Sequence, residues 1–161
     1  MKIFVTADTH FNHENIIEYC NRPYKNALEM NEDIINKWNE IVTNEDIIYH
    51  LGDFGFGSKK ELQDIFNRLN GQKYLIMGNH DLRVGKKYYL DLGFINVYKK
   101  FFELDGKYIF THKPVEVLPD KINIYGHIHD KPVDPRFDDE NHLCVSLDKT
   151  KFKPHLLVKK R

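Results

Sequence analysis

Metal-ligand side chains stand at the ends of five short apolar runs in this sequence. The donors are aspartate, histidine and one asparagine, without a thiolate, and such a set suits borderline divalent ions such as Mn, Fe, Ni or Zn. Strands of neighbouring units in an α/β sheet end side by side, so ligands just past their carboxyl ends converge in one crevice. The segments are Asp8-Thr9-His10, Gly52-Asp53, Gly78-Asn79-His80-Asp81, His112 and Gly126-His127-Ile128-His129.

Each segment follows an apolar run that we expect to form a buried strand. The runs are four or five residues long, which is the length of a strand and too short for a helix. Their carboxyl ends would position the candidate ligands. The runs are Ile3–Ala7, Ile47–Leu51, Lys73–Met77, Tyr108–Thr111 and Ile122–Tyr125.

Helical patterns separate the first three runs. Glu14–Cys20 is an expected short helix, and Glu29–Val42 is a longer one with apolar residues at helical spacing. Ser58 is a predicted N-cap for a third helix, Lys59–Leu69, with Glu61 as the reciprocal capping residue. This β-α-β-α-β order predicts a parallel sheet with right-handed crossovers.

The second half of the sequence is richer in strands. Val97–Leu104 and Lys107–Thr111 are two predicted strands, joined as a hairpin by Asp105-Gly106. His142–Ser146 and His155–Val158 are further short strands. A parallel half followed by a strand-rich half predicts two sheets packed face to face, with helices outside.

The composition excludes several classes of protein. The length of 161 residues predicts one domain, spanning 1–161, with a proper core. The 24 basic and 24 acidic residues cancel, which removes the strong electrostatic footprint of a dedicated nucleic-acid binder. No run is long enough to span a membrane and no signal core is present, so we expect a soluble, cytoplasmic protein. Cys20 and Cys144 have no metal or redox spacing and are expected to be reduced thiols.

The order of the ligand segments resembles the calcineurin-like metallophosphoesterase superfamily. Its pattern of D-x-H, G-D, G-N-H-[DE], a lone H and G-H-x-H is complete between Ile3 and His129. One such motif alone would carry little weight, whereas all five in order are specific. The run Asp8–Ile17, followed by Arg22-Pro23-Tyr24, is similar to compact bacterial and phage members. The resemblance implies a four-layer αββα sandwich of two mixed β-sheets flanked by helices.

The resemblance also implies a centre of two divalent transition-metal ions, Mn by preference, with Fe, Ni or Zn as alternatives. Such a pair lowers the pKa of a bridging water, and the resulting hydroxide would attack phosphorus. The ligands expected for one ion are Asp8, His10 and His129, those for the other are Asn79, His112 and His127, and Asp53 would bridge the two ions.

Two further residues of the third segment have expected catalytic roles from the same resemblance. His80 would face the substrate and give a hydrogen bond or proton to the leaving-group oxygen. Asp81 would accept a hydrogen bond from the other ring nitrogen of His80 and fix its tautomer. The predicted function is hydrolysis of a phosphodiester or phosphomonoester, with a nucleotide among the candidate substrates.

Three residues near the first two segments have less specific expectations. His13 and Arg22 could both contact a phosphate oxygen, Arg22 through a two-pronged hydrogen bond. The alternative is that His13 caps a helix and Arg22 pairs with a carboxylate. His50 is expected to pack or to support a ligand, because the family does not use that position as a ligand.

Three rival functions use the same residues or the same fold. A nuclease or a phosphoprotein phosphatase would share the centre, but no extended basic surface is apparent, which favours a small-molecule or nucleotide phosphoester. A non-catalytic scaffold of this fold typically lacks the catalytic histidine or a ligand, whereas this chain retains all of them. The sequence therefore predicts an enzyme, and it indicates no oligomeric state.

Overall fold

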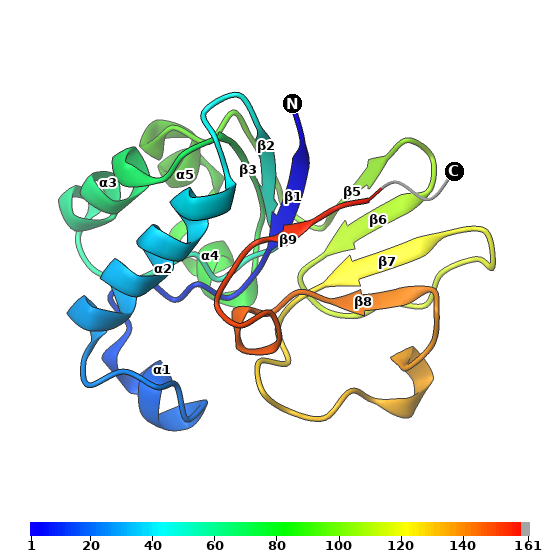
Figure 1. The fold of residues 1–161 in the computed structure, drawn as a ribbon. Helices are drawn as coiled ribbons and strands as arrows, with labels where there is room; N and C mark the ends of the chain where they lie inside the picture. The colour runs from blue at the N-terminus through cyan, green and yellow to red at the C-terminus, as the bar shows by residue number, and fades with distance from the viewer. Residues whose placement is uncertain (159–161) are drawn as a thin grey trace.

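Two β-sheets packed face to face form the centre of the structure, a computed structural model that describes residues 1–158 (Figure 1). The basic end Lys159–Arg161, for which the sequence predicts a solvated tail, lies outside the described residues. The predicted α/β sandwich of two mixed sheets with helices is confirmed.

The first sheet has five strands in the order β4-β3-β2-β1-β9. Strands β1 to β4 are parallel, as the β-α-β-α-β pattern predicts, and Ile3 of β1 pairs in register with Ile47 of β2. Strand β9 closes the edge by pairing antiparallel with β1. The strands are β1 (Ile3–Thr6), β2 (Ile47–His50), β3 (Gln72–Ile76), β4 (Asn96–Tyr98) and β9 (His155–Leu156).

Within the described residues the α-helices all precede β4, and α2, α3 and α5 cover the outer face of the first sheet (Figure 1). Helix α3 begins with the predicted capping box, in which Ser58 and Glu61 cap each other's backbone amides. Helices α4 and α5 were not expected. Gly85 separates them, and with six and seven residues each is too short to show a clear helical period of apolar residues. The helices are α1 (Glu14–Tyr19), α2 (Ala27–Ile41), α3 (Lys59–Arg68), α4 (Asn79–Val84) and α5 (Lys86–Leu92).

The second sheet has four strands in the order β5-β6-β7-β8. Strands β5 and β6 form the predicted hairpin, and both Asp105 and Gly106 at its turn have positive φ. Strands β6, β7 and β8 are parallel. The strands are β5 (Phe101–Leu104), β6 (Tyr108–Thr111), β7 (Ile122–Tyr125) and β8 (His142–Cys144).

The single strand predicted over Val97–Leu104 is wrong, because this segment forms two strands in different sheets. Strand β4 is an edge strand of the first sheet, and the chain then crosses at Lys99-Lys100 into β5 of the second sheet. Val97 packs in the core on the helix side, whereas Phe102 packs between the sheets. Both halves are apolar because each packs into a hydrophobic core, and no glycine or proline between them signals the crossing.

Aromatic side chains hold the two sheets together. The ring of Tyr49 from the first sheet lies 5.3 Å from that of Phe102 and 4.9 Å from that of Phe110, both in the second sheet. On the outer face of the second sheet, loops and the 3-10 helix η1 (Pro135–Phe137) provide the cover within residues 1–158. In this chain the fourth layer is therefore built from loops. No helix in the same described range is long and apolar enough to cross a membrane.

Candidate functional site

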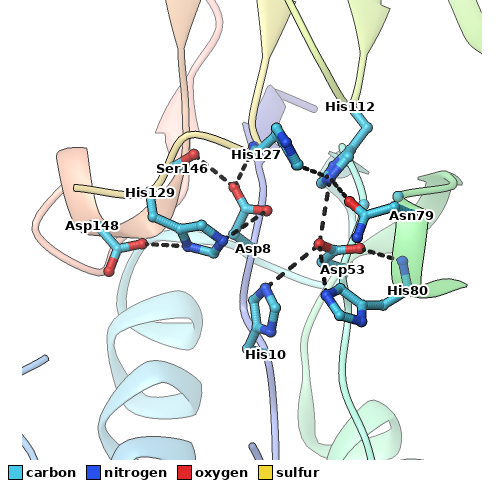
Figure 2. Close-up of polar contacts among 12 residues, drawn as sticks. Asp8, His10, Asp53, Asn79, His80, His112, His127, His129, Ser146 and Asp148 are labelled. Carbon is cyan, nitrogen blue, oxygen red and sulfur yellow. Dashed lines mark hydrogen bonds and ion pairs between the residues drawn. The ribbon is translucent and has the colours of Figure 1, made fainter. Parts of the chain in front are cut away.

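The structure places the five ligand segments together at the carboxyl ends of β1, β2, β3, β6 and β7 (Figure 2). Backbone hydrogen bonds join the loops directly: the Asp8 amide donates to the Gly52 carbonyl at 2.9 Å, and the His10 amide donates to the Asp53 carbonyl at 3.1 Å. Across the other sheet, the Gly126 amide donates to the His112 carbonyl at 2.9 Å. The loops therefore form one rigid cluster.

The first group of candidate ligands is Asp8, His10 and His129. One ligand atom of each lies within 4.8 Å of the others. Asp8 Oδ1 and His10 Nε2 are buried and have no hydrogen-bond partner within the described residues. A buried polar atom without a partner costs about 1–3 kcal/mol. Two such atoms in one N/O group fit a bound divalent cation.

The second group is Asp53, His112 and His127, whose ligand atoms satisfy the same distance limit of 4.8 Å. His112 Nε2 lies 3.1 Å from both Asn79 Oδ1 and His127 Nδ1. Asp53 Oδ2 lies 3.4 Å from His112 Nε2 and 3.6 Å from His10 Nε2, so one carboxylate oxygen faces both groups. Its position suits a ligand shared between two ions.

The protonation of the buried groups favours metal binding. Burial lowers the pKa of His10 to about 2 and that of His127 to about 4, so both imidazoles are neutral and carry a free lone pair. Burial would raise the pKa of Asp53, but the neighbouring His112 and His10 hold it below the ordinary value. His10 and His127 thus present neutral imidazoles near a carboxylate, whereas burial opposes the charge of His112 but its hydrogen bond to Asp53 holds its pKa above the ordinary value.

Five of the candidate ligands have a positive φ angle, a backbone conformation that residues other than glycine seldom adopt. Such residues persist only where the surrounding structure holds them, and they concentrate at functional sites. Gly52 also has a positive φ of 101°, and a Cβ atom there would lie 2.5 Å from the Gly78 backbone. The ligands concerned are Asp8 (φ 60°), His10 (48°), Asp53 (57°), His127 (73°) and His129 (52°).

Supporting hydrogen bonds orient the ligands, and two of the supporting residues were missed in the sequence. The Asp148 carboxylate accepts from His129 Nδ1 at 3.1 Å, which turns Nε2 toward Asp8. Ser146 Oγ and the His127 amide donate to Asp8 Oδ2 at 2.6 and 2.8 Å, leaving Oδ1 free. No spacing pattern signals these partners: Ser146 is 138 residues from Asp8, and Asp148 follows His129 by 19 residues without a motif that joins them.

The neighbours of His129 favour the protonated form of its ring. Burial opposes its charge, but the hydrogen bond to Asp148 and the contact with Cys20 raise its pKa to about 10. A cation bound at Nε2 would displace that proton, so metal binding here is coupled to proton release. Cys20 is buried and Cys144 is half-buried, and both are free thiols, as the sequence predicts.

His112 and His50 are also supported from the loops. His112 Nδ1 donates to the Leu51 carbonyl at 2.7 Å, so its Nε2 is the atom that faces the centre. His50 is buried, and its two ring nitrogens contact Thr9 Oγ1 at 2.9 Å and the Gly52 amide at 3.2 Å. His50 therefore packs against the first two ligand loops, and its support of a ligand remains a prediction.

Arg22 forms the carboxylate pair that is one of its two expected roles. Arg22 is only 4% exposed, and its guanidinium donates to both oxygens of Asp148 at 2.9 and 3.0 Å. It also donates to the carbonyls of Asp8 and Thr9 at 2.7 and 3.1 Å. Arg22 therefore holds the first ligand loop against the carboxylate that orients His129.

His13 lies at the edge of the centre. It is the N-cap position of α1, but its side chain makes no capping hydrogen bond. Its Nδ1 lies 3.0 Å from His10 Nδ1, and its ring centre lies 4.3 Å from that of Phe56 and 6.4 Å from that of His80. Helix capping by its side chain is thus excluded, and contact with substrate remains a prediction.

Phe56 is an aromatic wall of the site that the sequence did not indicate. Its ring centre lies 5.1 Å from that of His80, and the residue is half-buried. Its amide donates to the Phe11 carbonyl at 2.8 Å, and its carbonyl accepts from Asn12 Nδ2 at 3.0 Å. The loop that presents Phe56 is therefore held from both sides.

The role expected for Asp81 is wrong. Its Oδ2 accepts from the amides of Gly78 and Asp53 at 2.8 and 2.7 Å, and its Oδ1 accepts from the Phe54 amide at 3.2 Å. Among the described residues it has no hydrogen bond to the ring of His80. Asp81 lies in the first turn of α4 and reaches back to the loop, while the His80 side chain is one-third exposed and lies 4.0 Å from Asp53. Asp81 therefore holds two ligand loops together.

Asp81→Asn is expected to destabilise the fold and to lower activity equally for all substrates. The amide would turn an N–H group toward a backbone donor, which costs about 1–3 kcal/mol for each donor left without an acceptor. Denaturant unfolding measures the stability, with exposed Asp64→Asn as the matched control. A loss of kcat that shrinks with better leaving groups would instead restore the orienting role toward His80.

Comparison with known proteins identifies relatives across nearly the whole chain. The model of the calcineurin-like phosphoesterase family matches residues 1–156. The chain is 35% identical over 162 residues to MJ1445, an uncharacterized protein of Methanocaldococcus jannaschii, covering 95% of this chain and 85% of that protein. It is also similar to the crystal structure of AQ665, a protein of unknown function from Aquifex aeolicus, with a TM-score of 0.74 and 28% identity over 96% of this chain and 95% of that one.

Proposed function

This chain belongs to the calcineurin-like phosphoesterase family, and from that premise we propose that it hydrolyses phosphoesters at a centre of two divalent metal ions. The family implies metal-dependent phosphoester hydrolysis, and the dinuclear centre is our addition. One observation carries it: Asp53 Oδ2 lies within 3.6 Å of an imidazole nitrogen from each of the two ligand groups.

The ligand assignment follows from the two groups and from the atoms that remain free. Mn is the favoured ion, because a set of imidazole and carboxylate donors suits borderline metals. Where one ring nitrogen of a histidine is already hydrogen-bonded, the other ring nitrogen would bind the metal ion. One ion would be held by Asp8, His10 and His129, the other by Asn79, His112 and His127, and Asp53 would bridge them.

When bound, the two cations would activate a water for attack on phosphorus and offset the charge of the phosphoryl oxygens. The protein would supply the opposite side of the reaction. His80 is the proposed general acid, because its side chain is one-third exposed at the site while its backbone is fixed by a 3.1 Å hydrogen bond from its amide to Asp53 Oδ1. It would give its proton to the leaving oxygen as the P–O bond breaks. Phe56 and His13 would shield that side from water.

We propose a small-molecule or nucleotide phosphoester as the substrate. The net charge of zero supports this class over an extended nucleic acid, which would require a basic surface. A nuclease or a phosphoprotein phosphatase would use the same residues, and a substrate panel separates these alternatives. A scaffold role is disfavoured because His80 and the whole ligand set are present.

Chelation followed by metal reconstitution tests the proposal. Activity against aryl phosphodiesters, aryl phosphomonoesters, cyclic nucleotides, single-stranded DNA and a phosphopeptide should vanish with chelator and return with Mn²⁺. Mg²⁺ should restore less, because it prefers water and carboxylates to imidazoles. Exposed His155→Ala should behave like wild type.

Two outcomes would contradict the proposal. Full activity in Mg²⁺ alone after thorough chelation would argue against imidazole ligation. Absence of turnover for every ester under every metal would favour the scaffold.

A further inference from the structure

A cavity of about 330 Å³ opens beside the second group of candidate ligands. Asn79 and His112 line it, so it is continuous with the proposed second metal site. Apart from Thr111, the remaining lining is apolar or cationic. The apolar residues are Met77, Leu82 and Val115, and the cations are Lys100 and Lys113.

The elements around the cavity hold its walls in place. Met77 follows β3, and its amide donates to the Tyr98 carbonyl at 2.8 Å, which fixes the chain just before Lys100. The carbonyl of Lys113 accepts from Thr111 Oγ1 at 2.6 Å, and the Val115 amide donates to Asn123 Oδ1 at 3.1 Å. Both lysines thus extend from a backbone that is already ordered.

The two lysines have no acidic partner in the part of the chain that the structure describes. Among the same described residues, no carboxylate lines the cavity. Some other lysines of this chain form ion pairs and some do not, so the feature that distinguishes these two is that both line one cavity. Two like charges beside one cavity repel each other, and an anion between them would offset that repulsion. Lysines with acidic partners are Lys37, Lys59, Lys87, Lys121 and Lys153.

The apolar part of the cavity narrows the class of anion. Leu82 and Val115 are 52% and 37% exposed, so their surfaces are open to a ligand. A polyol phosphate would place hydroxyl groups against apolar side chains and leave them without hydrogen bonds. A nucleoside with a phosphate fits better, because its base covers apolar surface while its phosphate meets the cations.

We propose that this cavity is a subsite for a second phosphate of a nucleotide substrate, held by Lys100 and Lys113. This inference rests on the proposed phosphoesterase function and specifies its substrate class. The scissile phosphorus would lie at the metal centre, and the nucleoside and its second phosphate would extend past Asn79 and His112 into the cavity.

Two chromogenic esters with the same leaving group test the subsite. Thymidine 5′-(4-nitrophenyl phosphate) carries only the scissile phosphate, and its 3′-phosphorylated counterpart carries a second one. The Mn²⁺-loaded protein should hydrolyse the 3′-phosphorylated ester with a kcat/KM about 10- to 100-fold higher, the size expected for charge-assisted hydrogen bonds. In the Lys100→Ala/Lys113→Ala variant, the ratio of the two kcat/KM values should fall close to one.

Lys99→Ala is the matched control, because Lys99 is exposed and adjacent but does not line the cavity. It should keep the wild-type ratio, and Lys113→Arg should keep most of it. A wild-type ratio near one, or an equal loss in Lys99→Ala, would overturn the subsite.

Calorimetric binding of thymidine 3′,5′-bisphosphate separates this inference from the proposed function. Binding that weakens about tenfold or more in the double lysine variant but not in Lys99→Ala supports the subsite even if neither ester is hydrolysed. In that case the proposed hydrolysis would be contradicted, while the proposed subsite would be supported. Turnover of both esters without lysine-dependent binding would retain the function and overturn the subsite.

Discussion

Asp53→Asn is expected to remove nearly all phosphoesterase activity. The Oδ2 atom of Asp53 lies 3.6 Å from His10 Nε2 and 3.4 Å from His112 Nε2, so both ligand groups lose their shared anion. The amide keeps the shape of the side chain but not its charge. Loss of one supporting partner of a ligand typically costs about 10–100-fold, so loss of a shared ligand should exceed about 100-fold. The measurement is kcat/KM in excess Mn²⁺.

Two comparisons make this result specific to the centre. His10→Ala should weaken mainly the first group, because His10 belongs to that group alone. Exposed Asp64→Asn should match wild type. An Asp53→Asn protein that retains activity within about tenfold of wild type would show that no essential charge is shared there.

His80→Ala is expected to lower kcat by about 10²–10⁴, the range typical of a positioned general acid. The loss should be largest for an alkyl ester, whose leaving oxygen needs a proton, and small for a nitrophenyl ester. Metal content and fold should stay near wild type, because the one-third exposed side chain makes no hydrogen bond to the loops within residues 1–158. The measurement is kcat across esters of graded leaving-group pKa.

The slope of that series distinguishes the roles open to His80. A loss that is the same for every leaving group would mean that His80 stabilises the phosphoryl oxygens. A loss of metal together with activity would make it a ligand or a structural residue. His155→Ala, at an exposed position on β9, controls for removal of an imidazole as such.

Local patterns predict much of the fold. The parallel strands and α3 follow from short apolar runs and from the pair Ser58 and Glu61, because each signal is contained in a few neighbouring residues. The split at Lys99-Lys100 could not be predicted, since both halves of the run are buried and only the tertiary structure assigns them to different sheets. Helices α4 and α5 were missed because they are too short for a clear period.

The candidate site shows the same division between local and distant information. The ligand segments could be located because each directly follows a strand, and the strand ends determine where they meet. Asp148 and Ser146 could not be found, because they reach Asp8 and His129 only through folding of the C-terminal segment. Asp81 was misassigned for a related reason: it lies in the first turn of an unpredicted helix, where a carboxylate reaches back to the preceding loop.

Metal content of the Mn²⁺-reconstituted protein tests the central claim most directly. After chelation, reconstitution and removal of free metal, wild type should retain two ions per chain, and Asp53→Asn should retain one or fewer. These two values are expected because Asp53 Oδ2 lies close to both ligand groups, so its charge would serve both ions. Wild-type protein that binds one ion or fewer in excess Mn²⁺ and is still fully active would contradict the dinuclear centre.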